Sequence, residues 1–331
     1  MDPTSKVALG KTTIQVTRMG LGGAPLGGLF EDVPEDAALA TIRRALDLGL
    51  NLFDTAPLYG HGKSELRFGK ALLGTDRTSW VLATKVGRLL VPVESERMEA
   101  DEYNNPAPFL PVFDFSYDGV MRSYEESLKR LNVGRIDILH IHDPDDHFEQ
   151  AMEGAYRALD ELRRQKLIHA VSAGMNQAEM PARFARAGNF DCFLLAGRYT
   201  LIDHTGLREL LPLCAEKKIG IIIGGPYNSG VLATGARPGA KFNYADAPLA
   251  VLEKVRKVSA VCDRHLVSMK AAALQFPLAH PAVAAVIPGA RSVSELEENF
   301  RLLREPIPAD FWAELRQEKI LPPEAPIPGR S

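Results

Sequence analysis

Cysteine is scarce in this chain of 331 residues. The three thiols, Cys192, Cys214 and Cys262, are odd in number and far apart, so no pair has the spacing of a disulfide framework, a redox motif or a zinc site. The sequence therefore predicts reduced thiols in or near the core, as is usual for cytoplasmic proteins. The N-terminus has no apolar signal core and no run approaches about 18 apolar residues, so we expect neither a secretory leader nor a membrane span.

A basic surface is missing as well. Lys and Arg number 39 against 42 Asp and Glu, which gives a formal net charge of −3. Nucleic-acid-binding proteins usually concentrate basic residues on one face. The one short basic cluster, 163–166, is predicted to end a helix, where the helix dipole favours cations. We therefore expect a small molecule as the partner, rather than a nucleic acid or a membrane, and a monomer or small homo-oligomer.

Short apolar runs alternate with helical periodicity from about residue 17 onward. Eight of these runs are predicted to be strands: Met19–Leu21, Leu50–Phe53, Trp80–Ala83, Ile136–Ile141, Leu167–Val171, Cys192–Leu195, Ile219–Ile223 and Val283–Ile287. Amphipathic stretches separate them, such as the stripe of Leu39, Ile42 and Leu46. Strands joined by helices form parallel sheets, because each crossover needs a connection as long as a helix. Eight such units without a linker favour a single α/β domain over residues 1–331, a closed (β/α)₈ TIM barrel rather than a doubly wound sheet.

Three segments depart from this alternation. Residues 7–16 alternate on both sides of a Gly-Lys pair, which predicts an N-terminal β-hairpin that could close the barrel floor. Residues 86–118 form a long loop after the third predicted strand, and 225–247 form another after the seventh. Long loops in a compact domain usually carry function, and both follow the carboxyl ends of strands, where barrel enzymes place their sites. The substrate site is therefore expected between these loops.

Polar residues stand at the ends of three consecutive predicted strands. Asp54 follows the second strand, Lys85 the third and His142 the fourth, and Tyr59 comes five residues after Asp54. The carboxyl ends of barrel strands share one mouth, so these side chains should converge. A neighbouring ammonium lowers the pKa of a phenol, ordinarily about 10, and a carboxylate holds that ammonium in place. We therefore predict an Asp54–Lys85–Tyr59 proton relay beside His142, serving a hydride transfer that needs a cofactor because no side chain carries hydride.

Four segments resemble the aldo-keto reductase family in order and spacing. They are 53–60 (FDTAPLYG), 83–85 (ATK), 137–144 (DILHIHDP) and 287–290 (IPGA) together with 298–300 (ENF). The resemblance covers nearly the whole chain. It implies an NAD(P) cofactor across the barrel mouth, bound without a Rossmann domain, and a catalytic tetrad at Asp54, Tyr59, Lys85 and His142.

The same resemblance implies that strand ends around the mouth and the helix after the last strand hold the cofactor. The residues concerned are Gly23, Asp54, Asn176, Tyr227, Asn228, Ser229, Gly230, Leu232, Pro288, Gly289, Ala290, Arg291, Glu295, Glu298 and Asn299. The chain departs from the family at the nicotinamide, where Ala196 replaces a usual glutamine and only Asn176 remains of a usual Ser-Asn pair. Glu295 stands where NADP-preferring relatives often carry an arginine, which favours NAD, while Arg291 one turn earlier leaves NADP possible.

Substrate contacts are expected around the same mouth. The candidates are Tyr59, His142, Asp143, Arg198 and Tyr227, with Tyr199 nearby. Asp143 replaces a usual aromatic residue, and it either binds sugar hydroxyls or only caps the loop before Pro144. Segments 174–176 and 224–230 resemble those of the aldose 1-dehydrogenases, which oxidise L-fucose, D-threo-aldoses or L-galactose, and of pyridoxal 4-dehydrogenase. The resemblance implies oxidation of a cyclic aldose at C1 to its lactone, with pyridoxal as the alternative substrate.

Two other classes of function stay open on the sequence. His140 and His142 form an H-x-H at a strand end, as in metal-dependent barrel hydrolases, but the other histidines fall in predicted loops, helices or strand starts. His140 is predicted to be a hydrogen-bonded core residue one layer below His142, and no metal is expected. The other class is a reductase scaffold that binds without turnover, as in subunits that accompany ion channels, and the intact tetrad argues against it.

Overall fold

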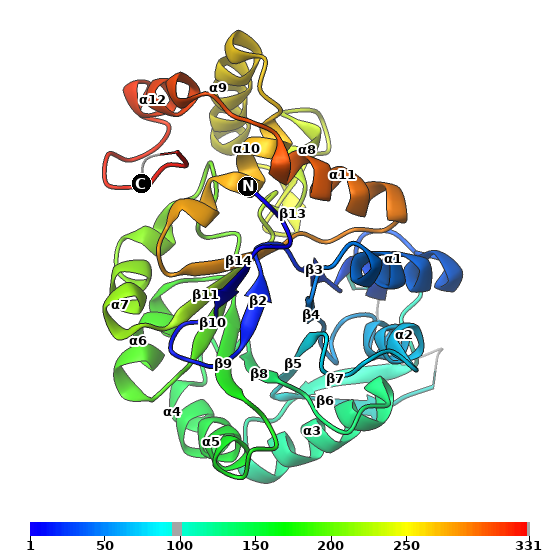
Figure 1. Ribbon diagram of the computed structural model, residues 1–331. Helices are drawn as coiled ribbons and strands as arrows, with labels where there is room; N and C mark the ends of the chain where they lie inside the picture. Colours follow the sequence, from blue (N-terminus) through cyan, green and yellow to red (C-terminus); the bar gives the residue numbers. More distant parts are fainter. Residues whose placement is uncertain (95–100, 330–331) are drawn as a thin grey trace.

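The computed structural model describes residues 1–94 and 101–329, so residues 95–100 of the predicted loop 86–118 lie outside the described residues. Its centre is a sheet of eight parallel strands (Figure 1). In spatial order they are β3 (Leu21–Gly22), β4 (Leu52–Asp54), β5 (Val81–Val86), β8 (Ile138–His142), β9 (Ala170–Met175), β10 (Cys192–Ala196), β11 (Gly220–Gly224) and β14 (Val283–Ile287). Parallel bridges from Met19 to Val286 and from Gly22 to Gly289 join the two edges. The predicted (β/α)₈ barrel is therefore confirmed.

Helices surround the sheet (Figure 1). The longer ones are α1 (Glu35–Asp47), α2 (Lys63–Leu72), α3 (Tyr117–Leu131), α5 (Arg157–Arg164), α6 (Glu179–Ala187), α7 (Leu210–Lys217), α9 (Leu249–His265), α10 (Met269–Gln275), α11 (Val293–Arg304) and α12 (Ala309–Gln317). Each contributes apolar side chains to the buried core, as α1 does with Ile42. Ser116 and Ser292 cap α3 and α11 by accepting hydrogen bonds from backbone N–H groups three residues on. In the described part of the chain, no helix is long and apolar enough to cross a bilayer.

One predicted strand lies out of place. The fifth was expected at Leu167–Val171, but β9 runs from Ala170 to Met175. Lys166 has a left-handed φ of 61° and ends α5, and Leu167 is 43% exposed. The strand itself carries Ser172, Ala173 and Gly174, whose small side chains do not form an apolar run although all are buried. The shift puts Asn176 directly after the carboxyl end of the strand.

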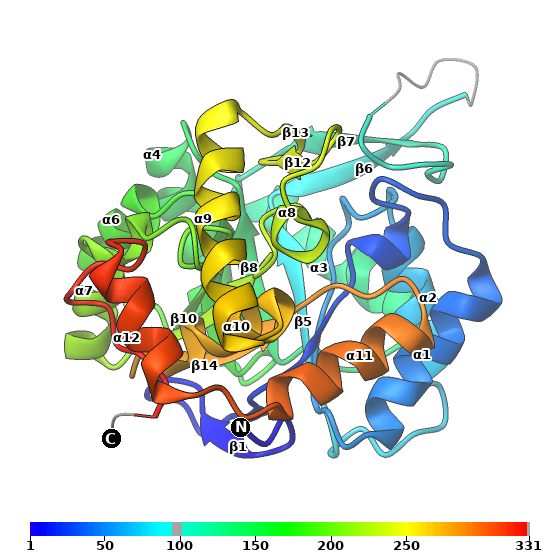
Figure 2. The same ribbon diagram turned by 90° about the horizontal axis from the view of Figure 1, so that it is seen from above.

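The N-terminal hairpin is confirmed. β1 (Lys6–Ala8) pairs antiparallel with β2 (Gln15–Thr17) at the end of the barrel opposite the long loops (Figure 2). Leu9, Ile14 and Val16 pack against the apolar side chains inside the barrel and close its floor. Gly10 has a φ of 59°, and a Cβ atom there would lie 2.4 Å from the backbone nitrogen of Gly220, so only glycine fits this close approach.

The two predicted long loops contain structure of their own. The first forms a two-stranded antiparallel ribbon of β6 (Arg88–Pro92) and β7 (Phe109–Phe113), which projects beyond the barrel (Figure 2). The second contains the short helix α8 (Val231–Thr234) and a small hairpin of β12 (Lys241–Phe242) and β13 (Ala245–Asp246). Both border the carboxyl end of the parallel strands, as predicted.

Candidate active site

The four side chains of the predicted tetrad meet at the barrel mouth. Asp54 is the last residue of β4, Lys85 lies near the end of β5, and His142 is the last residue of β8. The Lys85 ammonium donates to Asp54 Oδ1 at 2.6 Å and to the Thr55 carbonyl at 2.8 Å. It lies 4.7 Å from the centroid of the Tyr59 ring, and the His142 ring stands 6.0 Å from that ring at an angle of 88°. The arrangement places a phenol between an ammonium and an imidazole.

Asp54 and Lys85 form an ion pair that is almost completely buried. Asp54 is 2% exposed and Lys85 is 1% exposed. Burial raises the pKa of Asp54, but the Lys85 ammonium and the neighbouring His140 outweigh burial, and the net effect lowers the pKa. The carboxylate is therefore ionised at neutral pH and holds the ammonium in one position.

The protonation state of Tyr59 differs from the prediction. Burial raises the pKa of Tyr59 well above its ordinary value, and the Asp54 carboxylate raises it further. The expected lowering by Lys85 is not found, because the charge of Lys85 is balanced by Asp54 at 2.6 Å. In this state Tyr59 is a neutral phenol that can donate a proton, so its use as a base needs a further positive charge nearby.

His142 is a neutral imidazole. Burial lowers its pKa well below the ordinary value, and the charges of Arg88 and Lys85 lower it further. Its Nε2 atom lies 3.5 Å from Asp143 Oδ2. A neutral imidazole can orient a substrate hydroxyl by one hydrogen bond without adding charge to the site.

His140 is a hydrogen-bonded core residue, as predicted. The side chain is fully buried, with Nδ1 2.7 Å from Ser172 Oγ and Nε2 3.3 Å from Asp54 Oδ2. Both ring nitrogens thus face protein groups inside the barrel. Among residues 1–94 and 101–329, no group of three or more His, Cys, Asp or Glu side chains is arranged to hold a metal ion. The three cysteines are buried and free, and burial raises the pKa of each thiol to about 12.

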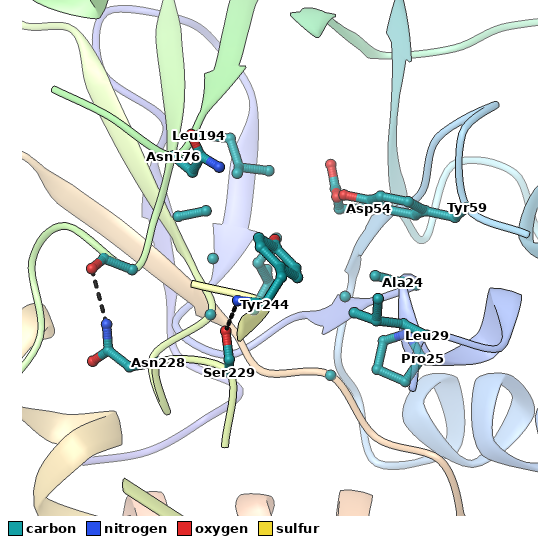
Figure 3. A pocket seen from close by; sticks show the side chains of 18 of the residues that line it. Ala24, Pro25, Leu29, Asp54, Tyr59, Asn176, Leu194, Asn228, Ser229 and Tyr244 are labelled. Carbon is teal, nitrogen blue, oxygen red and sulfur yellow. Dashed lines mark hydrogen bonds between the residues drawn. The ribbon is translucent and has the colours of Figure 1, made fainter. Parts of the chain in front are cut away.

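A cleft opens beside Tyr59. Figure 3 shows Tyr59 and Asp54 on one side and Asn176 and Leu194 on the other, with Tyr244 between them. Six of the predicted cofactor residues line it: Gly23, Asp54, Asn176, Asn228, Ser229 and Gly289. They come from loops or strand ends after β3, β4, β9, β11 and β14, so the cleft crosses the barrel mouth.

The other predicted cofactor residues lie around this cleft without lining it. They are Tyr227, Gly230, Leu232, Pro288, Ala290, Arg291, Glu295, Glu298 and Asn299. The Tyr227 hydroxyl donates to Asn299 Oδ1 at 2.6 Å, and Leu232 and Ala290 are buried in the core. Glu298 is paired with Lys270. The Tyr227, Asn299, Leu232 and Ala290 side chains therefore make internal contacts, whereas Arg291 and Glu295 pair with each other at a partly exposed position.

A second pocket continues from the cleft past Tyr59 toward the β6–β7 ribbon. The two share Tyr59, Asn176, Leu194, Ala196 and Tyr244. The second pocket is also lined by Leu58, Lys85, Arg88, Asp101, Glu102, Tyr103, Pro111, Phe113, His142, Asp143, Asp145, Gly174 and Met175. Tyr59 thus lies at the junction of the cleft and the second pocket, where a molecule bound in one would meet a molecule bound in the other.

Three of the predicted substrate residues, Tyr59, His142 and Asp143, line this second pocket, whereas Arg198 and Tyr227 do not. The Arg198 guanidinium donates to Asn243 Oδ1 at 2.9 Å and holds the β12–β13 hairpin. The expectation for Tyr199 is wrong. Its side chain is fully buried, with its ring 4.9 Å from that of Phe276, because it points into the core.

Arg88 is the main residue that the sequence analysis missed. It donates to Asp143 Oδ2 at 3.0 Å, and its guanidinium lies 4.2 Å from the Phe113 ring centroid. Asp143 has a left-handed φ of 45° and carries its carboxylate between Arg88 and His142. The carboxylate is therefore held in the pocket by a side chain of the ribbon, and the short apolar segments 88–92 (RLLVP) and 109–113 (FLPVF) do not alternate in a way that predicts this pairing.

Comparison with known proteins agrees with this geometry. A model described as the aldo/keto reductase family matches residues 18–319, which include all eight barrel strands and the tetrad. The chain is 36% identical to pyridoxal 4-dehydrogenase of Microbacterium luteolum, over 96% of this chain and 98% of that protein. It is 34% identical to D-threo-aldose 1-dehydrogenase of a Pseudomonas species, over 93% and 96%. A solved aldo-keto reductase from Bacillus halodurans, in its holo form, shares the fold with a TM-score of 0.75 at 24% identity, over 95% and 96%.

Proposed function

Because this chain belongs to the aldo/keto reductase family and is an NAD(P)-dependent oxidoreductase, we propose that it oxidises the C1 carbon of a cyclic aldose to the lactone, with NAD as the hydride acceptor. The choice of substrate rests on the position of the Asp143 carboxylate. Its carboxylate is fixed by Arg88 at 3.0 Å beside His142. A carboxylate accepts several hydrogen bonds, so it can pair with hydroxyls that leave water when a sugar binds.

The charge of the second pocket supports a neutral polyhydroxy substrate. Asp101, Glu102 and Asp145 line the pocket in addition to Asp143. Its two cations are already paired, Lys85 with Asp54 and Arg88 with Asp143. An anionic substrate would find no unpaired cation among these side chains, whereas a sugar finds hydrogen-bond acceptors.

The first cleft fits a nicotinamide dinucleotide. Six of its lining residues are glycines at loops and strand ends, where backbone N–H groups can approach phosphates. The buried Asn228 Oδ1 atom has no hydrogen-bond partner in the described structure, while Asn228 Nδ2 donates to the Gly197 carbonyl. Asn176 lies across the cleft from Tyr59 (Figure 3) and would hold the carboxamide. When bound, the nicotinamide supplies the hydride acceptor and, in its oxidised form, a positive charge.

In the proposed reaction the side chains of this chain move one proton. The neutral His142 orients the C1 hydroxyl toward Tyr59. Asp54 holds the Lys85 ammonium in its position over the Tyr59 ring. Tyr59 must first release its own proton to solvent, and a positive charge on a bound oxidised nicotinamide would favour this by lowering the pKa that burial raises. The Tyr59 phenolate then takes the hydroxyl proton as C1 loses hydride.

Pyridoxal is the second candidate substrate. In its cyclic hemiacetal form it undergoes the same oxidation to a lactone, and the rings of Tyr103 and Tyr244 line the pocket with Tyr59, where a flat pyridine ring could stack. The 36% identity to pyridoxal 4-dehydrogenase supports this candidate as well.

A substrate panel separates the two candidates. We expect NADH formation, followed at 340 nm, with at least one of L-fucose, L-galactose and D-arabinose. Asp143→Asn should lower kcat/KM for that sugar by about 10- to 100-fold, because it weakens hydrogen bonds to a charged acceptor. The loss with pyridoxal, which offers fewer hydroxyls, should be smaller. Turnover of pyridoxal with none of the three sugars would contradict the aldose proposal and support the second candidate.

Cofactor preference is predicted to depend on Glu295. The Arg291 side chain and backbone N–H both donate to the Glu295 carboxylate, and Arg291 is also paired with Glu31. These two carboxylates neutralise the cation that could bind a 2′-phosphate, so NAD should bind more tightly than NADP. Glu295→Arg reverses one charge and releases Arg291, and the NADP-to-NAD affinity ratio should rise about tenfold or more.

The measurement is fluorescence quenching by each oxidised cofactor. Glu297→Arg is the matched control, since it makes the same charge change on α11 but at a side chain paired with Arg44 of α1. It should leave the ratio close to that of the wild type. Tighter binding of NADP than NAD by the wild type would show that the Glu295 interpretation is wrong.

A further inference from the structure

His140 stands between the tetrad and the barrel interior. Its Nε2 atom lies 3.3 Å from Asp54 Oδ2, the carboxylate oxygen that Lys85 does not use. Its Nδ1 atom lies 2.7 Å from Ser172 Oγ of β9. In the described structure neither Asp54 Oδ2 nor His140 Nε2 makes a hydrogen bond of regular geometry to any group, and the two buried atoms face each other at 3.3 Å. When two buried polar atoms face only each other, removing one of them leaves the other without a hydrogen-bond partner.

The chemistry of the neighbours decides where the protons lie. An ionised carboxylate only accepts hydrogen bonds, so the proton between Asp54 and His140 must be on Nε2. Burial lowers the pKa of His140, so the ring is neutral and carries a single N–H. Nδ1 is then an acceptor, and its donor is the hydroxyl of Ser172. Ser172 thus hydrogen-bonds to His140, whose Nε2–H faces Asp54 Oδ2 at 3.3 Å, and the other oxygen of Asp54 accepts from Lys85.

We propose that His140 is a positioning residue for the hydride-transfer reaction, which fixes Asp54 through Oδ2 so that Oδ1 stays directed at Lys85, while Ser172 selects the required tautomer. Asp54 is then held from two strands, β5 and β8, and cannot turn away from the ammonium. His140 lines neither pocket, so it acts through Asp54 and not on substrate or cofactor. His140 and Ser172 thus support the tetrad whichever substrate is oxidised, and this role rests on the proposed function.

The test compares His140→Leu with His140→Gln. Leucine removes the donor, and kcat should fall by roughly 10- to 100-fold with little change in KM. Glutamine keeps an N–H donor toward Asp54 and a carbonyl acceptor toward Ser172, so it should restore most of the loss. Ile138→Val is the control, because Ile138 lies two residues earlier on β8 and faces the same interior. It should keep wild-type kcat.

The pH profile separates positioning from packing. The groups facing His140 are Asp54 from β4, Lys85 from β5, His142 on its own strand and Ser172 from β9, and Cys192 of β10 interacts in turn with Ser172. Without the Nε2 donor the pKa of Asp54 rises, because the charged form loses a stabilising contact. Activity needs the ionised carboxylate, so the acid limb of kcat should move to higher pH in His140→Leu and stay in place in Ile138→Val.

A double-mutant cycle with Asp54→Asn gives a readout that needs no substrate. The destabilisation measured in urea for His140→Leu should shrink in the Asp54→Asn background, because the charge that it leaves unpaired is gone. Full additivity, or equal losses of kcat in the Leu and Gln variants, would overturn the proposal in favour of packing alone. If neither His140 variant folds, Ser172→Ala takes their place, and a wild-type acid limb in that variant overturns the proposal. A wild type that oxidises no substrate of the panel would contradict the proposed function, and the urea cycle would still test the positioning role.

Discussion

Replacing Tyr59 with phenylalanine is expected to lower kcat by about 10²- to 10⁴-fold, the usual contribution of a general acid or base. The Tyr59 side chain lines both the cleft and the second pocket, with its ring beside the Lys85 ammonium and the His142 ring. In the proposed reaction this change removes the atom that exchanges a proton with the substrate, and it keeps the ring. Cofactor affinity, measured by fluorescence quenching, should therefore stay close to that of the wild type.

Tyr124→Phe is the matched control for Tyr59→Phe. Tyr124 is a buried tyrosine of α3 that lines neither the cleft nor the second pocket, so losing its hydroxyl should leave kcat unchanged. A Tyr59→Phe enzyme with unchanged turnover would remove the tyrosine from the mechanism.

The pH dependence of the wild type tests the protonation state of Tyr59. Burial holds the pKa of the phenol above its ordinary value, so the phenolate fraction grows only as pH rises. Oxidation uses the phenolate and should accelerate with increasing pH, whereas reduction of the product uses the neutral phenol and should not. Tyr59→Phe should lose this rise in the oxidation rate.

The barrel and the meeting of the four tetrad side chains at its mouth were predictable because their signals are local. Asp54 and His142 each follow an apolar run directly, and parallel strands of one barrel end at one mouth. Knowing the strand order was therefore enough to bring residues far apart in the sequence together. The His140 contact with Asp54 needs more, since it depends on how deep each side chain lies inside the barrel.

The contacts that the sequence did not predict either join residues far apart in the chain or depend on the direction in which a side chain points. Arg88 reaches Asp143 only because β6 pairs with β7, and this register places Arg88 opposite Phe113. Tyr199 follows the end of β10 at a bend, and the sequence does not say whether its ring turns to the mouth or to the core. Sequence periodicity identifies elements, whereas these contacts are decided by packing between elements.

Replacing Lys85 with methionine is expected to damage both stability and catalysis. Methionine has a similar length but no charge, so Asp54 Oδ1 loses its ion pair in a place with almost no exposure to water. Removing one partner of a buried pair typically costs about 3–5 kcal/mol of unfolding free energy. The phenol also loses its neighbouring ammonium, and kcat should fall on the order of 10²-fold or more.

The pH dependence of this destabilisation has a definite sign. In the wild type the pKa of Asp54 is lowered, chiefly by Lys85 acting against burial. Without Lys85, burial dominates and raises the pKa of Asp54 above its unfolded value. A group whose pKa is raised in the folded state stabilises that state below the unfolded pKa and loses this stabilisation as pH rises through the folded pKa. Lys85→Met should therefore be closest to wild-type stability in acid and fall away from it toward neutral pH.

The variant Asp54→Asn/Lys85→Met separates the two effects of Lys85. With the carboxylate neutralised, no charge is left buried alone, so the double variant should unfold at higher urea than Lys85→Met while kcat stays as low. Arg130→Met is the control for stability alone, because Arg130 pairs at 2.6 Å with the buried Glu65 and lines neither the cleft nor the second pocket. That variant should lose stability and keep its kcat. If the double variant recovered turnover along with stability, the loss in Lys85→Met would come from misfolding, and the ammonium would have no role in the reaction.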